Sequence, residues 1–392
     1  MTERYRTVLY FIGLIGFLSA LGMSIPAPIL PAYAKQFGAS PVLIGTLFSA
    51  YSASWVFLQV FTGHLSDRWG RKRFIVLGLI VYGVFGLLVG NARTMVELLL
   101  LRTLQGTGVS LFGSPAIALV GELPGESGKN FGFFRSCQGV GLAAGPFIGG
   151  FLSDTYGLRV PFYMNGLMGL FAALMGSIFL IETRRKMEKG MPFRQTLKIL
   201  SQHRKLHFLI GAIFLSELTF VALDLLFPLR GEQLGMSFKQ IGILFACYMV
   251  IFSITQTPIG VLSGKIGDRK IILSLMTGVT ALIFFIATRV ESFQGILLVS
   301  GGLGIFLGGS FTQSTAFASD LVPPERKGIS LALFDSAIDS TFFIAPVLVG
   351  VVIEYFSLEG AFLTCALLNL VAFIIIISFL RTNRLNTLNC CA

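Results

Sequence analysis

The sequence predicts an all-α membrane protein with twelve transmembrane helices in two pseudo-symmetric six-helix bundles. Composition, the spacing of apolar runs and an internal repeat support this fold class. Of the 392 residues, 54% are hydrophobic and only 12% are charged, about half the charged share of soluble globular chains. So few charges cannot cover a water-exposed surface, and hydrocarbon is therefore expected to surround most of the chain.

Apolar runs of about 20 residues, the length that crosses a hydrocarbon core, recur along the whole chain. They lie near 8–32, 41–62, 74–91, 95–120, 131–152 and 161–181 in the first half, and near 207–229, 239–262, 271–288, 293–318, 330–353 and 361–380 in the second. Each is expected to be helical, because lipid offers backbone groups no hydrogen-bond partner. No small-residue cleavage site follows the first run, which predicts that it is retained as a helix.

The distribution of Lys and Arg predicts that both chain ends face the cytoplasm. With the N-terminus inside, 22 of the 30 Lys and Arg residues fall in cytoplasmic segments, 6 fall outside, and Arg102 and Arg135 lie within helices. Such an excess is typical of cytoplasmic loops. The net charge of +11 is spread over short clusters and forms no basic stripe with interleaved aromatics, so no nucleic-acid partner is expected.

The two halves of the chain resemble each other. A shift of 197 residues gives 12 identities among the 33 positions from Gly38 to Gly70, and they include Gly, Tyr and Gln. A shift of 200 residues pairs Pro146 with Pro346. Duplicated halves place a binding cavity between them, near the bilayer midplane. The predicted parts are an N-terminal bundle over 1–182, a cytoplasmic linker over 183–206, a C-terminal bundle over 207–381 and a cytoplasmic tail over 382–392.

The loop after the second apolar run reads Gly63-His64-Leu65-Ser66-Asp67-Arg68-Trp69-Gly70-Arg71-Lys72-Arg73. It resembles the signature loop of the major facilitator superfamily, G-x-L-x-D-R-x-G-R-[KR]-[KR], at every position. The resemblance implies a conformational latch of the outward-open state, in which Asp67 meets the N-terminus of helix eleven. The latch residues would be Gly63, Asp67, Arg68, Gly70, Arg71 and Glu122. The alternative is a loop that only determines topology.

The second copy of this loop departs from the pattern. At the shift of 197 residues, Gly264, Lys265 and Asp268 replace the Asp, Arg and Arg of the first copy. Any latch in the second half is therefore expected to be weaker or differently built.

Further motifs resemble those of the same superfamily. Arg102-Thr103-Leu104-Gln105-Gly106-Thr107-Gly108 is similar to its R-x-x-Q-G-x-G element. Helix one, with Gly22, Pro28 and Pro31, resembles the pattern of the twelve-helix drug:proton antiporter group. The stretch from Gly141 to Gly150 is similar to G-x-x-x-G-P-x-x-G-G, a motif associated with antiporters. A spacing of four puts small residues on one helix face, where they permit close packing. Packing and hinging alone also explain this run. Its motif residues are Gly141, Gly145, Pro146, Gly149 and Gly150.

Ionisable residues within apolar runs are costly and usually mark function. The resemblance implies that these proton-coupling candidates line the cavity: Arg102, Glu217, Asp224, Asp335 and Asp339. Arg102 is expected to meet a carboxylate or an anionic substrate, or else to organise helices, whereas Asp335 has a second reading as a helix cap. Ser19 and Ala20 stand where this group often carries an acid, so Glu217 and Asp339 are the expected proton carriers.

Repeated Tyr and Gln residues are candidates for hydrogen bonding to a substrate, although they could equally bridge helices. They are Tyr51, Gln59, Gln105, Tyr248, Gln256 and Gln313.

The expected function is secondary active transport by alternating access, as proton-coupled efflux of lipophilic or cationic small molecules. The alternative is a symporter or uniporter for a sugar, a metabolite or an organic anion. No nucleophile, metal or nucleotide motif indicates an enzyme, so no cofactor and no metal are expected. The protein is expected to act as a monomer in the cell (inner or plasma) membrane.

Overall fold

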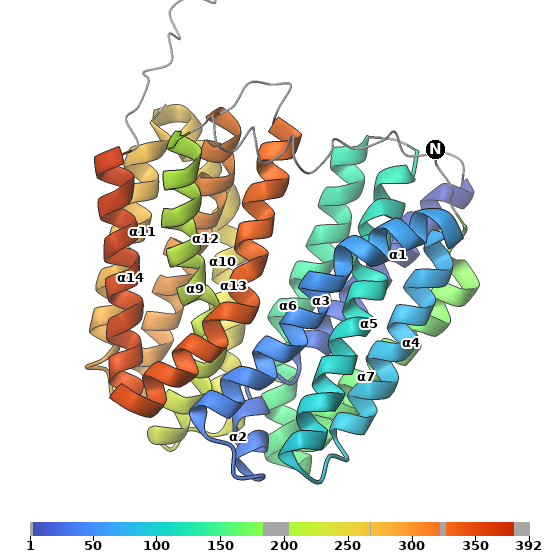
Figure 1. The fold of residues 1–392 in the computed structure, drawn as a ribbon, viewed down its shortest axis with the longest axis horizontal. Helices are drawn as coiled ribbons and strands as arrows, with labels where there is room; N and C mark the ends of the chain where they lie inside the picture. The colour runs from blue at the N-terminus through green and yellow to red at the C-terminus, as the bar shows by residue number, and fades with distance from the viewer. Residues whose placement is uncertain (1–2, 125, 183–203, 267, 322–326, 380–392) are drawn as a thin grey trace, which may run out of the picture. The chain divides into compact units, whose positions relative to one another are not determined.

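A computed structural model describes residues 3–124, 126–182, 204–266, 268–321 and 327–379 (Figure 1). These residues form helices joined by short turns and contain no strand. The helices of the first sequence half are α1 (Glu3–Ser24), α2 (Leu30–Lys35), α3 (Pro41–Trp69), α4 (Arg71–Val89), α5 (Met95–Glu122), α6 (Ser127–Tyr156) and α7 (Val160–Phe179). Those of the second half are α9 (Arg204–Gln233), α10 (Phe238–Ile266), α11 (Arg269–Ala287), α12 (Phe293–Asp320), α13 (Lys327–Phe356) and α14 (Leu358–Phe379).

Eleven of the described helices are long and apolar enough to cross a membrane. The short α2 and the 30-residue α6 are the other two. Helix α6 has the length to span but carries seven glycines together with Lys129, Arg135 and Asp154, so its mean hydropathy is low. All twelve predicted spans therefore fall on long helices. Most of the predicted linker (183–206) and of the tail (382–392) lies outside the described residues.

The first predicted span differs from the structure near its end. The apolar run over 8–32 predicts one helix, whereas α1 ends at Ser24 and a turn over residues 25–29 precedes α2. Pro26 and Pro28 lie in this turn. A proline has no N–H for the helical ladder, and it disfavours helical conformation in the residue before it, so the chain leaves the helix here.

Helix lengths confirm the predicted duplication. Corresponding helices of the two halves have the same length, and their starting residues are offset by 197 to 200 positions. The pairs are α3 and α10 with 29 residues each, α4 and α11 with 19, α5 and α12 with 28, and α6 and α13 with 30.

Helix ends and turns also repeat. Thr94 caps α5 by accepting a hydrogen bond from the Glu97 amide, and Ser292 caps α12 in the same way. Gly38 and Gly235 occupy matching positions of the two copies, and both have positive φ angles, of 73° and 65°. Such angles suit glycine because it has no Cβ. The repeat thus extends from the sequence to the backbone conformation of its turns.

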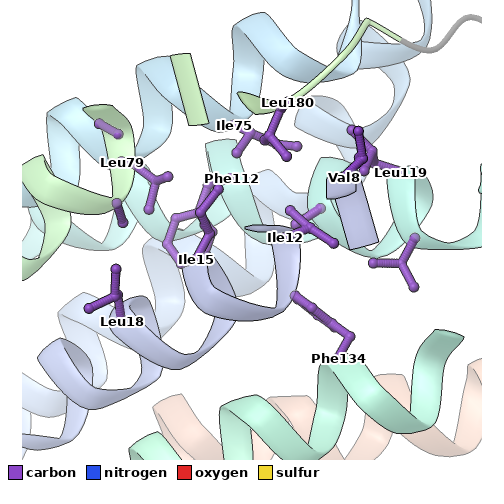
Figure 2. Packing of buried hydrophobic residues seen from close by; sticks show 14 of the residues in the cluster. Val8, Ile12, Ile15, Leu18, Ile75, Leu79, Phe112, Leu119, Phe134 and Leu180 are labelled. Atoms are coloured by element: carbon purple, nitrogen blue, oxygen red, sulfur yellow. The ribbon is translucent and has the colours of Figure 1, made fainter. Parts of the chain in front are cut away.

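The first half has its own apolar core (Figure 2). Apolar side chains of α1 recur every three or four residues, as expected for one helix face. They pack against α4, α5, α6 and the residue that follows α7. The residues labelled in Figure 2 are Val8, Ile12, Ile15, Leu18, Ile75, Leu79, Phe112, Leu119, Phe134 and Leu180, all less than a tenth exposed.

The second half has a separate core of the same kind. Helix α9 contributes Leu206, Leu209 and Ile213, and these residues pack in one cluster with side chains of α11, α12, α13 and α14. Helix α11 contacts α12 and α14, as α4 contacts α5 and α7. The same packing scheme therefore serves both copies.

Contacts divide the chain into two compact units that differ from the sequence halves. The first unit comprises Met1–Lys189, Asp224–Met249 and Phe342–Tyr355, and the second comprises Gly190–Leu223, Val250–Thr341 and Phe356–Ala392. The first unit thus joins the helices of the first half to the C-terminal part of α9, the N-terminal part of α10 and the C-terminal part of α13.

Candidate functional site

Arg102 lies on α5, where it is only 6% exposed. Its guanidinium carbon is 4.4 Å from the centroid of the Tyr51 ring, and one terminal nitrogen donates to Oε1 of Gln105 at 2.8 Å. Its Nε has no hydrogen-bond partner, and no carboxylate among the described residues forms an ion pair with it. The ring face attracts the cation, but the positive charge is not neutralised by these contacts.

A series of hydrogen bonds holds Gln105, the partner of Arg102, in place. Gln105 donates to Oδ1 of Asn165 at 2.8 Å. Asn165 in turn donates to the carbonyl of Gly22 and to the hydroxyl of Tyr82, both at 2.6 Å. The series connects α5, α7, α1 and α4, and it reaches α1 at Gly22, two residues before that helix ends. The sequence did not point to Asn165 or Tyr82, and the only available signal was a lone amide in an apolar run.

Helix α9 carries two of the predicted acids. Glu217 is 5% exposed and Asp224 is half-buried. Neither forms a hydrogen bond or an ion pair with another described residue. An ionised carboxylate is costly when buried without a partner, and Glu217 is the more buried of these two acids.

The residues next to Glu217 are fixed by a buried amide. Asn369 of α14 accepts from Ser216 at 2.9 Å and donates to Thr219 at 2.9 Å. Thr219 corresponds in the repeat to Gly22, the residue bonded by Asn165 in the first half. The two copies thus use one asparagine each to connect their last helix to their first long helix, and in the second copy this bridge flanks Glu217.

The acids of α13 are less enclosed. Asp335 is exposed and Asp339 is half-buried. Both lie in the second unit, as Glu217 does, whereas Asp224 and Arg102 lie in the first. The five candidates are therefore distributed over both units, and their coupling roles remain predictions.

The predicted cavity residues differ in burial. Four are buried, with exposures from 0% to 6%: Tyr51, Gln105, Tyr248 and Gln313. Gln59 and Gln256 are half-buried. Gln313 donates to the carbonyl of Ile259 at 3.2 Å, and it thereby bridges α12 and α10. No cluster of three or more His, Cys, Asp or Glu side chains suited to a metal ion occurs in the described ranges.

The predicted latch residues meet around Arg71, which is 4% exposed. Arg71 pairs with Asp67 and with Glu122, the latter at 3.1 Å, and donates to Oγ of Ser66 at 2.8 Å and to the carbonyl of Gly63 at 3.5 Å. Arg68 is exposed and forms no such contact with another described residue. Gly70 ends α3 with a φ of 109°, which lets the chain turn directly into α4. Helix eleven of the prediction, α13, starts beside residues outside the described ranges.

The second half contains a related cluster, and it corrects the repeat alignment. The counterpart of Arg71 in the second copy is Arg269 and not Asp268, which the fixed shift of 197 residues had given. Arg269 of α11 binds Asp320 at 2.5 Å and donates to Oγ of Ser263 at 3.3 Å. Arg269 is the counterpart of Arg71, and Asp320 is the counterpart of Glu122. Both second-copy residues lie the same number of positions after the first-copy residues that they correspond to. Asp268 instead caps α11 by accepting from the amides of Lys270 and Ile271. The loop is one residue longer than in the first copy, and Gly264 leaves no carboxylate in the place of Asp67.

The glycine motif of α6 has two packing faces. Gly141 and Gly145 lie against α1, and Gly149 lies against Ile25 just after it; a Cβ on any of the three would overlap atoms of residues 17–25. Gly150 lies against the carbonyl of Phe238 on α10, and the carbonyl of Pro146 lies against Gly242. The first face packs within the first sequence half, and the second face packs against the second half.

Comparisons with known proteins agree with this architecture. The family model of the Major Facilitator Superfamily matches residues 12–230 and 209–389. A transporter of this type from Methanocaldococcus jannaschii is 27% identical over 388 residues, covering 96% of this chain and 98% of the relative. Multidrug resistance protein 2 of Bacillus subtilis is 26% identical over 297 residues, covering 72% and 73%.

Among solved structures, a bacterial homologue of the human lysosomal transporter Spinster, captured inward-facing and occupied, superposes with a TM-score of 0.83. It is 16% identical and covers 96% of this chain and 97% of its own. At that identity the likeness shows the fold alone.

Proposed function

The chain belongs to the Major Facilitator Superfamily, and we propose that it exports lipophilic or cationic small molecules in exchange for protons. Membership makes it a multi-pass membrane transporter. The exchange with protons, the direction of export and the substrate class are the proposal. The protein acts as a monomer in the cell membrane with both termini in the cytoplasm.

The observation that carries the proposal is the environment of Glu217. Glu217 is 5% exposed, and its carboxyl group lacks a hydrogen bond or ion pair with any described residue. A charged carboxylate in this position is stable only with a cation beside it. A substrate cation and a proton both satisfy that requirement, so they compete for the same group.

Competition at one carboxyl group gives an exchange cycle. A proton that enters from the outside neutralises Glu217 and displaces the cationic substrate to that side. Loss of the proton to the cytoplasm restores the charge and allows the next substrate to bind. Asp339 of α13 is the second carrier in this cycle, and Asp224 and Asp335 lie along the same helices. The similarity to Multidrug resistance protein 2 supports a substrate of this kind.

Inside-out proteoliposomes with an acidic lumen test the proposal. Ethidium added outside is expected to accumulate and to make the lumen less acidic, since each cation that enters displaces a proton. Glu217→Gln is expected to abolish the gradient-driven accumulation. Glu359→Gln, an exposed acid at the start of α14, is the matched control and is expected to retain it. Gradient-driven accumulation by Glu217→Gln would remove this residue from the mechanism.

A second candidate function rests on Arg102. Its buried guanidinium has a free Nε and no acidic partner among the described residues, which favours an anionic ligand. This observation supports the alternative of a symporter or uniporter for an organic anion. In the same vesicles, uptake of salicylate that Arg102→Gln abolishes, together with no transport of ethidium, would select the alternative.

A further inference from the structure

Two carboxylates lie on helix N-termini that belong to the other sequence half. Asp154, at the end of α6, accepts hydrogen bonds from the amides of Phe238 and Lys239 at 3.0 and 2.8 Å. These amides begin α10. The first amides of a helix have no partner within the helix, and a negative charge is stabilised there by the helix dipole. Asp154 therefore caps a helix to which it is not connected in sequence.

The second copy contains the reciprocal contact. Glu354, at the end of α13, accepts a hydrogen bond from the amide of Val42 at 3.2 Å, in the first turn of α3. In the repeat, Glu354 is the counterpart of Asp154, and Val42 is the counterpart of Lys239. Each half thus supplies one carboxylate and one capped helix. The first-copy helix begins with Pro41, which has no N–H, so it offers one donor where α10 offers two.

Glycines bring the same backbones close together. Gly150 faces the carbonyl of Phe238 and Gly350 faces that of Pro41, while Gly45 and Gly242 face the carbonyls of Pro346 and Pro146. A Cβ at any of these four glycines would overlap the facing backbone. Helix α3 therefore packs closely against α13, and α6 packs closely against α10. Each carboxylate cap lies at one end of such a helix contact, and all of these contacts belong to the first unit.

An ion pair also joins equivalent residues of the two copies. Lys35 and Glu232 are 2.6 Å apart and occupy the same position in their respective copies. Where a two-fold axis relates two copies, a residue near the axis is expected to contact its counterpart in the other copy. Both side chains are more than a third exposed, so the pair contributes little to the free energy. Asp154 and Glu354 are exposed as well, so the buried glycine contacts carry most of the association and the two caps add a smaller share.

We propose that Asp154 and Glu354 are paired gating residues whose caps hold this end of the transporter closed and release it when the end opens. Under the predicted topology this is the outer end, since α1 runs toward it from a cytoplasmic N-terminus. A transporter that works by alternating access must separate the two sequence halves here once in each cycle. Removal of the caps therefore shifts the population toward the state that is open at this end. The proposal does not depend on the identity of the substrate.

Hydrogen exchange of the full-length protein in nanodiscs measures the shift without any substrate. In Asp154→Asn/Glu354→Gln, peptides over 41–51 and 238–248 are expected to exchange faster than in the wild type, by about two- to five-fold for each cap. Peptides over 60–69 and 258–266, at the opposite ends of α3 and α10, are expected to exchange more slowly. Loss of structure would instead speed exchange at both ends.

The single variants and one control complete the test. Asp154→Asn is expected to affect mainly 238–248 and Glu354→Gln mainly 41–51, so each tests one cap if the double variant fails to fold. Asp154→Glu keeps the charge and is expected to exchange like the wild type. Glu359→Gln is expected to do the same, because Glu359 is an exposed acid in the first turn of α14 and has no hydrogen bond or ion pair with the other half among the described residues. Wild-type exchange in the double variant would overturn the proposal, and so would faster exchange at both ends in the single variants.

Discussion

Arg269 and Asp320 form an ion pair with 2.5 Å between Nε and Oδ2, and this pair is the second-copy counterpart of Arg71 and Glu122. Both pairs join the start of one helix, α4 or α11, to the end of the following long helix. The first pair is nearly buried, with side-chain exposures of 5% and 12%, and the second is 30% and 37% exposed. The duplication has thus preserved the geometry of the pair while changing its contact with water.

This difference predicts unequal effects on stability. Glu122→Gln is expected to lower the free energy of unfolding by about 2 kcal/mol, because a hydrogen bond to a charged group contributes about 1.5–3 kcal/mol. Asp320→Asn is expected to lower the free energy of unfolding by less than about 1 kcal/mol, because exposed ion pairs contribute little to stability. Thermal denaturation of both purified variants in one detergent measures the two effects. Equal decreases would contradict the role assigned to burial.

The loop carboxylate predicts a functional effect rather than a structural one. Asp67 pairs with Arg71, and its resemblance to the superfamily motif assigns it to a latch of the outward-open state. Asp67→Asn is expected to reach the membrane in normal amounts and to lose transport, because an amide cannot provide the negative charge for the latch. Membrane fractionation and a transport assay check the two parts. Full transport by the variant would refute the latch.

Most of the fold could be predicted because lipid imposes a simple constraint. A run such as 95–120 is mostly apolar despite Glu97 and Arg102, and its length predicts a spanning helix, which the structure places at Met95–Glu122 as α5. The break after Ser24 was missed because three nearby prolines did not interrupt the apolar run. Asp268 was misaligned because one additional residue in the loop changes the offset between the copies, and a fixed shift cannot show that.

The site was less predictable, because its contacts join residues far apart in the sequence. Arg102 and Gln105 lie one turn apart and were identified from a motif. Asn165 meets Gln105 only through the packing of α5 against α7. Asp154 is at a helix end, where an acid is ordinary, and its role appears only when α10 is beside it. Pattern reasoning identifies costly residues within a span but not the partners that other helices supply.

The buried amides predict matched losses of stability in the two halves. Asn165→Ala removes bonds to Gln105, Gly22 and Tyr82 and leaves buried polar groups without partners. Each such group costs about 1–3 kcal/mol, so the free energy of unfolding is expected to fall by at least about 1 kcal/mol. Asn369→Ala is expected to give a similar decrease.

Ser177→Ala provides the control for these two variants. Its hydroxyl is exposed and bonds only to the carbonyl of Leu174, one turn away. Its replacement is expected to change the midpoint of thermal unfolding little. A decrease as large as that of Asn165→Ala would show that the assay reports any loss of a hydroxyl or amide, and the special role of the asparagines would not hold.

Two glycines of α6 separate the packing role of the motif from a general effect of glycine in a helix. A Cβ at Gly150 would meet the Phe238 carbonyl and lie 3.0 Å from the Cα of Lys239, whereas a Cβ at Gly139 would meet no atom within 4 Å. Gly150→Ala is expected to abolish transport, because α6 and α10 could no longer approach. Gly139→Ala is expected to keep transport and to gain up to about 1 kcal/mol of stability from the better helix former. Transport assays together with unfolding curves check both variants, and an active Gly150→Ala variant would show that this close approach is not required in the cycle.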